Sequence, residues 1–347
     1  MSTDKTRIAL IYAGGTIGSQ LDFKSGGLKP VDFNKLTFLL PEIETLNVQI
    51  TSFSVHQPKD SAEAGPEDWN ELAAIILSQY EFFDGFVVLH GTDTMGYAAS
   101  VLSFILEGLS KPVLFTGSQL PLNIRRSDGR ENILTAIELA SLQNEERKAI
   151  IQEVGILFHH KLYRGNRATK ISTEHFDAFE SPNYPPLAEI GVSIKVNDDR
   201  LWLAPHTKFY VTPIQAKIKI GFVTLFPGIS AEHVKSVGVM NGLSALVLET
   251  LGAGNAPYDK QLLKEIRNLI EKGVWVINLT SCKRGSVRQE EYAAGYRLAS
   301  LGVLSAFDLT REACIAKLYY LLSKTLSRSD FNKYWNQSLR GELTVKA

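Results

Sequence analysis

The 347-residue sequence contains no apolar stretch near the length of about 20 residues that a membrane span needs. It has only two cysteines, Cys282 and Cys314, and it lacks the C-x-x-C and H-E-x-x-H spacings of metal sites. Lysine plus arginine equals aspartate plus glutamate at 37 each, so no net charge attracts nucleic acid or an anionic membrane. The apolar run at 8–13 is too short for a signal-peptide core. We expect a soluble protein in a reducing compartment, the cytoplasm.

The order of expected elements indicates an α/β fold. Short apolar runs alternate with amphipathic helical patterns, which is typical of parallel sheets covered by helices on both faces. The length predicts two domains, and the composition of 44% hydrophobic and 21% charged residues is that of a globular protein. The strands expected in the first domain are 7–12, 48–54, 85–90, 113–116 and 154–158. The helices expected there are 66–80, 95–109 and 128–142.

The pattern changes over residues 181–217. Residues 181–186 include three prolines and cannot continue a helix. Residues 191–204 predict a hairpin that turns at 197–199, and residues 205–217 predict a connector. The alternation then restarts, with strands at 220–226, 245–249 and 274–279 and helices at 231–239, 258–271 and 311–323, the last closing the domain. The sequence thus predicts an N-terminal catalytic domain over 1–204, a linker over 205–217 and a C-terminal domain over 218–347.

A glycine-rich turn is expected after the first strand, where residues 13–18 read Ala-Gly-Gly-Thr-Ile-Gly. In parallel α/β sheets, ligands bind at the carboxyl ends of strands, and glycines let the backbone approach them closely. Thr16 is therefore a candidate nucleophile. The same pattern occurs in plain turns and phosphate loops, and these alternatives stay open. Nucleotide binding is weakly supported, because neither G-x-x-x-x-G-K-[ST] nor G-x-G-x-x-G is present.

Two further segments hold candidate polar side chains. Residues 90–95 read His-Gly-Thr-Asp-Thr-Met at another strand end, so Asp93 is either a helix cap or a site residue. Residues 167–173 read Arg-Ala-Thr-Lys-Ile-Ser-Thr, and a lysine in such a loop is usually a solvated charge. A partly buried lysine beside a threonine and an aspartate can instead act as a general base.

These segments resemble the signatures of the asparaginase/glutaminase family, in particular its type I cytoplasmic L-asparaginases. The resemblance covers nearly the whole chain. The family signature T-G-G-T-I-G aligns with residues 13–18, and H-G-T-D-T is intact at 90–94. Further matching segments, in family order, are 116–121, 127–129, 181–183, 252–257 and 339–342. The resemblance implies a larger flavodoxin-like N-terminal domain and a smaller Rossmann-like C-terminal domain.

The resemblance also implies an activity and roles for single residues. Thr16 would attack the side-chain amide carbon of L-asparagine and form a β-aspartyl ester. Thr92, Asp93 and Lys170 would form the second catalytic group, in which Lys170 is a general base that acts through Thr92. Asp93 would also bind the substrate α-amino group.

Further roles concern the substrate and the assembly. Ser61 would bind the α-carboxylate and Glu63 the ammonium group, while backbone N–H groups near Thr92 and Ser118 would stabilise the oxyanion. No metal or organic cofactor is expected. The family assembles into homodimers or homotetramers, and some type I members bind a second asparagine, for which residues 278–282 are the candidate segment.

The sequence departs from the family pattern at three places. Ala13 replaces the first threonine of the signature, and Ala62 lies in the segment that corresponds to D-S-S-D-M. Many members have a tyrosine in the loop after the first strand, where this chain has Leu28. Tyr292 is the candidate replacement, although a packed aromatic side chain explains it equally well.

Two alternatives to asparagine hydrolysis follow from the same residues. A catalytically impaired family member would bind a small amino acid without hydrolysing it. A subunit of a tRNA-dependent amidotransferase would use the same fold to release ammonia, but such subunits carry an additional N-terminal domain and contact tRNA.

Overall fold

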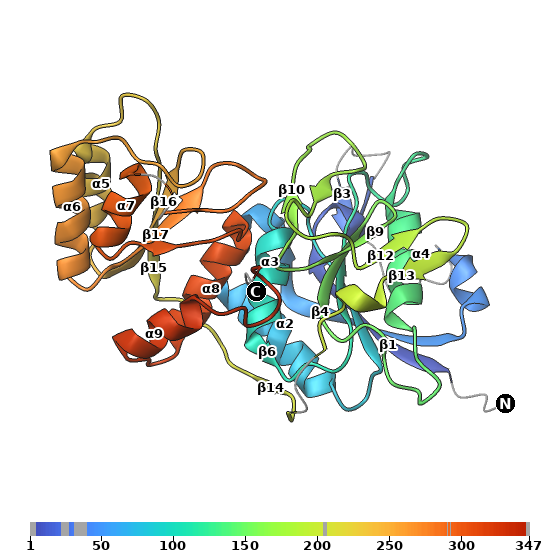
Figure 1. The fold of residues 1–347 in the computed structure, drawn as a ribbon. Coiled ribbons are helices and arrows are strands. Elements are labelled where there is room, and N and C mark those ends of the chain that lie inside the picture. Colours follow the sequence, from blue (N-terminus) through green and yellow to red (C-terminus); the bar gives the residue numbers. More distant parts are fainter. Residues whose placement is uncertain are drawn as a thin grey trace. The chain divides into compact units, whose positions relative to one another are not determined.

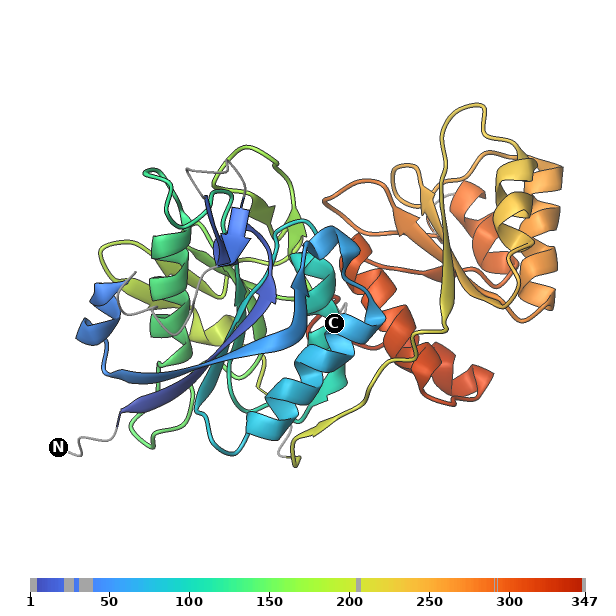
Figure 2. The same cartoon turned by 180° about the vertical axis from the view of Figure 1, so that it is seen from behind.

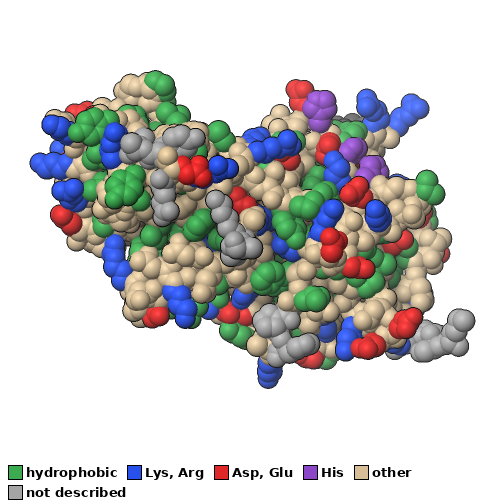
Figure 3. Space-filling view, viewed as in Figure 1, with side chains coloured by type: hydrophobic (Ala, Val, Ile, Leu, Met, Phe, Trp, Pro, Cys, Tyr) green, Lys and Arg blue, Asp and Glu red, His purple; other side chains and the backbone are tan. Residues whose placement is uncertain are grey.

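The computed structural model describes residues 5–21, 28–30, 40–203, 207–289, 291 and 293–344. The chain forms two units, Met1–Ile214 and Gln215–Ala347, each with a mainly parallel sheet and helices on it (Figure 1). This arrangement confirms the predicted fold class. Within the described ranges, no helix is both long and apolar enough to cross a bilayer. Acidic and basic side chains are interspersed on the face drawn in Figure 3.

The first unit is built on a sheet of eight strands in the order β13-β12-β9-β8-β7-β5-β1-β4. The parallel strands are β1 (Thr6–Gly14), β4 (Val48–Lys59), β5 (Gly85–Leu89), β7 (Val113–Thr116) and β8 (Val154–Phe158). The antiparallel extension comprises β9 (Lys161–Arg164), β12 (Ala188–Ile190) and β13 (Ile194–Val196). The five predicted strands of this unit are thus the five parallel ones.

Helices cover both faces of this sheet, which explains why its central strands β5, β7 and β8 are buried throughout. Helices α2 (Pro66–Gln79) and α3 (Met95–Ile105) lie on one face and α4 (Gly129–Ala140) on the other (Figure 1, Figure 2). Alternate residues of β1 share a buried cluster with α4, among them Ile8, Leu10 and Ile133. The sheet is therefore fixed from both sides, and its strand ends are held in place.

The predicted end of one helix in this unit is wrong. Helix α3 ends at Ile105 and not at 109, because Leu106–Glu107 forms β6 and pairs with β14 (Tyr210–Val211). The buried Glu107 carboxylate accepts hydrogen bonds from Tyr210 and Thr212 there. Within residues 205–217, predicted as a linker, this strand belongs to the first unit.

The predicted hairpin exists, but it turns earlier than expected. β12 and β13 pair around residues 191–193, and residues 198–200 form the short 3-10 helix η5 (Asp198–Arg200). The Asn197 side chain donates to the carbonyl of Pro186, so it ties the end of the hairpin to its beginning. The residue types at 197–199 favour a turn. In the structure Asn197 instead bonds back to Pro186, and residues 198–200 form η5.

The second unit has a parallel sheet in the order β15-β16-β17-β18. Its strands are β15 (Lys219–Thr224), β16 (Leu243–Thr250), β17 (Trp275–Thr280) and β18 (Leu304–Ser305). Its helices are α5 (Ala231–Gly238), α6 (Lys260–Glu271), α7 (Ala293–Ser300), α8 (Arg311–Ser323) and α9 (Arg328–Trp335). The α8 bounds equal the prediction, but α8 does not close the unit. In α9, Phe331 stacks on Trp275 with ring centroids 3.9 Å apart.

Candidate active site

A cavity of about 630 Å³ opens at the carboxyl ends of the parallel strands of the first unit. This is where parallel α/β sheets bind their ligands, because loops and helix N-termini meet there. The residues lining the cavity are Tyr12, Gly15, Thr16, Pro58, Lys59, Asp60, Ser61, Gly91, Thr92, Asp93, Ser118, Gln119, Lys170 and Thr173. Six predicted site residues therefore line this one cavity: Thr16, Ser61, Thr92, Asp93, Ser118 and Lys170.

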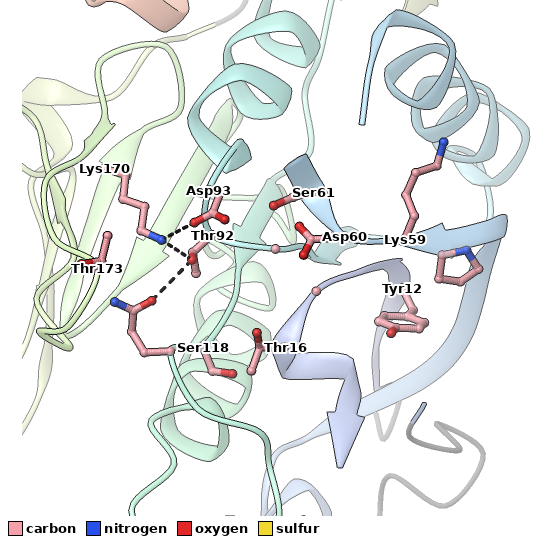
Figure 4. Close-up of a pocket in the computed structure, with 14 residues that line it drawn as sticks. Tyr12, Thr16, Lys59, Asp60, Ser61, Thr92, Asp93, Ser118, Lys170 and Thr173 are labelled. Atoms are coloured by element: carbon pink, nitrogen blue, oxygen red, sulfur yellow. Dashed lines mark hydrogen bonds and ion pairs between the residues drawn. The ribbon is translucent and has the colours of Figure 1, made fainter. Parts of the chain in front are cut away.

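The turn after β1 brings Thr16 to the cavity. Gly15 has a φ of +85°, and a Cβ atom added to it would lie 2.3 Å from the Cα of Gly91. Only glycine fits this conformation and this close backbone approach. The 3-10 helix η1 (Thr16–Gly18) begins at the next residue, and the Thr16 hydroxyl points into the cavity (Figure 4).

The end of β5 supplies Thr92 and Asp93. The preceding His90 is a core residue: burial lowers the pKa of its ring, and Nδ1 lies 2.8 Å from the carbonyl oxygen of Gly91. Asp93 does not cap α3, whose N-cap is Thr94. Its carboxylate instead faces Lys170. Of the two positions considered for Asp93, helix cap and site residue, it occupies the second, because it lines the cavity.

Lys170 reaches this pair from a separate part of the chain. It lies in β10 (Thr169–Lys170), which pairs with β11 (Phe179–Glu180). Its Nζ is 2.7 Å from Thr92 Oγ1 and 2.6 Å from Asp93 Oδ1. The Lys170 side chain is 17% exposed and that of Asp93 61% exposed. The lysine is thus largely withdrawn from solvent and oriented by two oxygen atoms (Figure 4).

The loop after β7 forms another wall. Ser118 is buried, and its hydroxyl donates to the carbonyl of Leu120 at 2.7 Å. The Asp128 carboxylate accepts hydrogen bonds from the backbone N–H groups of Gln119 and Leu120. Burial raises the pKa of the Asp128 carboxyl, and those N–H groups oppose the rise. This carboxylate therefore fixes the loop that presents Ser118 and Gln119.

The segment after β4 contributes the remaining polar wall. Asp60 is the N-cap of η4 (Ser61–Glu63) and lines the cavity. Ser61 is buried, and its carbonyl accepts a hydrogen bond from Thr94 at 2.6 Å. Glu63 is exposed and is not among the lining residues. The ion pair of Lys59 with Asp68, at 2.7 Å, draws that ammonium group toward α2 (Figure 4).

Three further predictions concern Tyr292, Leu28 and the segment 278–282. Tyr292 lies outside the described residues, and the backbone of Leu28 lies in β3 (Leu28–Pro30), which pairs with β2 (Ser19–Leu21). In the candidate effector segment, the Asn278 amide is buried and bonded to Thr250 and Gly254. The second asparagine site stays a prediction.

Sequence reasoning assigned no role to several lining residues, chiefly Asp60 and Gln119. Both lie inside segments that match family motifs, so position within a motif was the available signal. Gln119 contacts Thr92 and the carbonyl of His175. No sequence pattern predicts that contact, because it joins three separate loops.

Comparison with known proteins gives the ancestry of this site. Residues 7–202 match the family "Asparaginase, N-terminal", and residues 219–335 match "Glutaminase/Asparaginase C-terminal domain". The chain belongs to the asparaginase family. The resemblance inferred from the motifs is thereby confirmed at the level of the family.

Individual members of the family are similar over the whole chain. L-asparaginase 1 of Escherichia coli (strain K12) is 43% identical, and the match covers 98% of each protein. The crystal structure of L-asparaginase I from Vibrio cholerae superposes with a TM-score of 0.88 at 40% identity, over 99% of this chain and 100% of that one. A 60 kDa lysophospholipase of Mus musculus is 38% identical over 98% of this chain and 63% of its own length.

Proposed function

We propose that this protein is an L-asparagine amidohydrolase that produces L-aspartate and ammonia with Thr16 as the nucleophile. The observation that carries the proposal is the group Lys170–Thr92–Asp93, bonded at 2.7 and 2.6 Å in the cavity that Thr16 also lines. Similarity to L-asparaginase 1 over 98% of the chain supports the choice of substrate.

The reaction has two covalent steps. The Thr16 oxygen attacks the side-chain amide carbon, the C–N bond breaks, and ammonia leaves with the transferred proton. Water then attacks the resulting β-aspartyl ester, which releases aspartate and restores the hydroxyl. Apart from asparagine the reaction consumes only water, so its balance includes no redox or group-transfer cofactor.

Lys170 and Thr92 would move the protons in these steps. A lysine amine can accept a proton only in its neutral form, so Lys170 has to be neutral when it acts as the base. Thr92 lines the cavity together with Thr16 and is bonded to Lys170, so it can pass the proton. Backbone N–H groups beside Thr92 and Ser118 are the proposed donors to the oxyanion.

The amino-acid end of the substrate needs an anionic and a hydrogen-bonding wall. Asp60 and Asp93 both line the cavity and can accept from the α-ammonium group, while Ser61 is proposed for the α-carboxylate. Glu63 is not among the residues that line the cavity, whereas Asp60 is. We therefore favour Asp60 over Glu63 for that role.

The test is ammonia release from L-asparagine and L-glutamine, with fatty-acid release from a lysophospholipid measured separately as a control. Thr16→Ala and Lys170→Met should each abolish nearly all turnover of asparagine. The matched controls are Thr45→Ala, at an exposed threonine, and Lys148→Met, at an exposed lysine, neither of which lines the cavity. Both controls should retain full activity.

Calorimetry with L-aspartate distinguishes the binding-protein alternative. A native chain that binds aspartate but releases no ammonia would support the impaired family member instead. Retained activity in Thr16→Ala would refute the nucleophile.

The assembly and the role of Tyr292 are proposed from the resemblance alone. A homodimer or homotetramer in the cytoplasm, without nucleic-acid or membrane partners, is the expected state. Sedimentation analysis at assay concentration tests the assembly. Tyr292→Phe tests whether that hydroxyl assists Thr16, and an unchanged turnover would exclude it.

A further inference from the structure

The Gln119 side chain joins the Thr92 hydroxyl to the loop that follows Lys170. Its Oε1 atom lies 3.4 Å from Thr92 Oγ1. Its Nε2 atom lies 3.1 Å from the carbonyl oxygen of His175 and 3.5 Å from that of Ser172. One carboxamide therefore contacts both segments that supply the proposed proton-transfer group.

The chemistry of these neighbours fixes the orientation of the amide. Carbonyl oxygens only accept hydrogen bonds, so the side of Gln119 that faces His175 and Ser172 has to be the NH₂ group. The oxygen then faces Thr92. A flipped amide would place two carbonyl oxygens against a third and leave the NH₂ group to the hydroxyl.

This orientation determines the direction of the Thr92 hydroxyl. Because Oε1 of Gln119 only accepts, Thr92 has to donate its proton to it. The lone pairs of Thr92 Oγ1 are then free to meet the N–H of Lys170, whose Nζ lies 2.7 Å away. In this resting arrangement Lys170 donates to Thr92, and the proposed proton transfer to Lys170 requires the hydroxyl to turn from Gln119 toward the amine.

We propose that Gln119 is a positioning residue: its carboxamide contacts Thr92 and fastens the loop 172–175, and so holds Thr92 and Lys170 at bonding distance. The proposal rests on the proposed function, since it assigns Gln119 to the same reaction. Thr92 follows β5 and Lys170 lies in β10, so no regular element holds the two together directly.

Both ends of Gln119 are themselves anchored. The Asp128 carboxylate accepts from the Gln119 backbone N–H at 3.0 and 3.1 Å, and Asn132 in α4 donates to the same carboxylate at 3.4 Å. On the other side, Ser172 Oγ accepts from the N–H groups of Glu174 and His175. These bonds close the turn whose carbonyl oxygens face the Gln119 amide.

Two substitutions separate the functions of the carboxamide. Gln119→Met has a similar length and removes both the acceptor and the donor. Gln119→Glu keeps an acceptor for Thr92 but turns a carboxylate oxygen toward two carbonyl oxygens, so it loses the tie to the loop. The matched control is Gln152→Met, because Gln152 is also half-buried and donates to a backbone carbonyl, that of Ala149, at 3.0 Å.

Three measurements are made on each full-length variant: kcat for ammonia release from L-asparagine, the Kd of L-aspartate, and amide hydrogen exchange at residues 174 and 175. We expect Gln119→Met to lower kcat on the order of 10- to 100-fold, because small misplacements of reacting groups have effects of this size. Aspartate affinity should be unchanged and exchange faster. Gln119→Glu should accelerate exchange equally and lower kcat less, and Gln152→Met should change none of the three.

Other outcomes overturn the proposal or the function beneath it. An equal loss of aspartate affinity and kcat would make Gln119 a substrate ligand and not a positioning residue. Unchanged exchange in Gln119→Met would refute the tie to the loop, and unchanged kcat would refute the positioning role. If the native chain releases no ammonia, or Thr16→Ala stays active, the proposed function fails, while hydrogen exchange still decides whether Gln119 holds the loop.

Discussion

Lys170 Nζ lies 2.7 Å from Thr92 Oγ1, although 78 positions separate the two residues. The bond spans two segments that come together only in the folded first unit. Asp93, the neighbour of Thr92, accepts a second bond from the same amine at 2.6 Å. Asp93 therefore still holds the lysine when the Thr92 hydroxyl is removed. The role of that hydroxyl can thus be tested by itself.

Replacement of Thr92 by valine should lower kcat by a factor on the order of 10² to 10⁴, the usual range for loss of a proton-transfer group. Valine keeps the shape of threonine and leaves the Lys170–Asp93 pair in place. Thr92→Ser retains the hydroxyl and should keep most of the activity. Steady-state ammonia release checks both variants. Full activity in the valine variant would remove Thr92 from the proton path.

The positions of the central parallel strands could be predicted from sequence because β5, β7 and β8 are buried on both faces. Residues 113–116 and 154–158 were predicted with the bounds that β7 and β8 have. The end of α3 could not be predicted, since Leu106–Glu107 leaves the helix to pair with a strand far along the chain. Local patterns contain no information about such a partner.

The same limit applies to the site. Motifs predicted Thr16, Thr92 and Lys170, which line one cavity. Gln119 was inside a recognised motif, but its importance depends on carbonyl groups at 172 and 175, whose position is set by folding. Backbone atoms without a sequence signature thus determine what that glutamine does.

Gly15→Ala should impair both stability and activity. An added Cβ would lie 2.3 Å from Gly91 Cα, and backbone at that point has no room to move without displacing Thr16 or Thr92. A left-handed backbone conformation alone costs an alanine roughly 1–2 kcal/mol. Gly228→Ala is the matched control, because Gly228 has a φ of +93° and nothing within 4 Å of its Cβ position.

Urea denaturation and kcat measure the two glycine variants. Gly228→Ala should show only the conformational cost and normal turnover. Gly15→Ala should lose more stability and most of its kcat. Equal behaviour of the two variants would mean that the close approach of the strand ends is not required.

Lys317 and Glu342 form an ion pair in which both side chains are 0% exposed, with Nζ 2.7 Å from Oε1. Lys317 also donates to the carbonyls of Trp335 and Gln337, and Glu342 accepts from the backbone of Leu339 and Arg340. Lys317→Met should reduce the free energy of unfolding by about 3–5 kcal/mol, because it leaves a buried carboxylate unpaired.

The double variant Lys317→Met/Glu342→Gln should recover part of that loss, since no buried charge remains. Lys148→Met serves as control: its pair with Glu146 has the same 2.7 Å distance, but the side chains are 68% and 70% exposed. No measurable change is expected there, as exposed pairs contribute little. Urea denaturation checks all three, and additive losses in the double variant would argue against the pair as the cause.

His90 should make the protein lose stability as the pH falls. Burial lowers the pKa of the folded His90 ring, whereas in the unfolded chain a histidine titrates near pH 6.5. The unfolded state therefore takes up a proton that the folded state refuses, so the stabilisation is present above about pH 6.5 and is lost below it. One such proton changes the free energy of unfolding by at most about 1.4 kcal/mol per pH unit.

His90→Asn can still donate toward the carbonyl of Gly91 but cannot titrate. Its urea midpoint should fall less between pH 7.5 and 5.5 than that of the native chain, even where it starts lower. His233→Asn, at an exposed histidine, should leave the native slope intact. Parallel slopes for His90→Asn and the native chain would show that other groups cause the acid sensitivity.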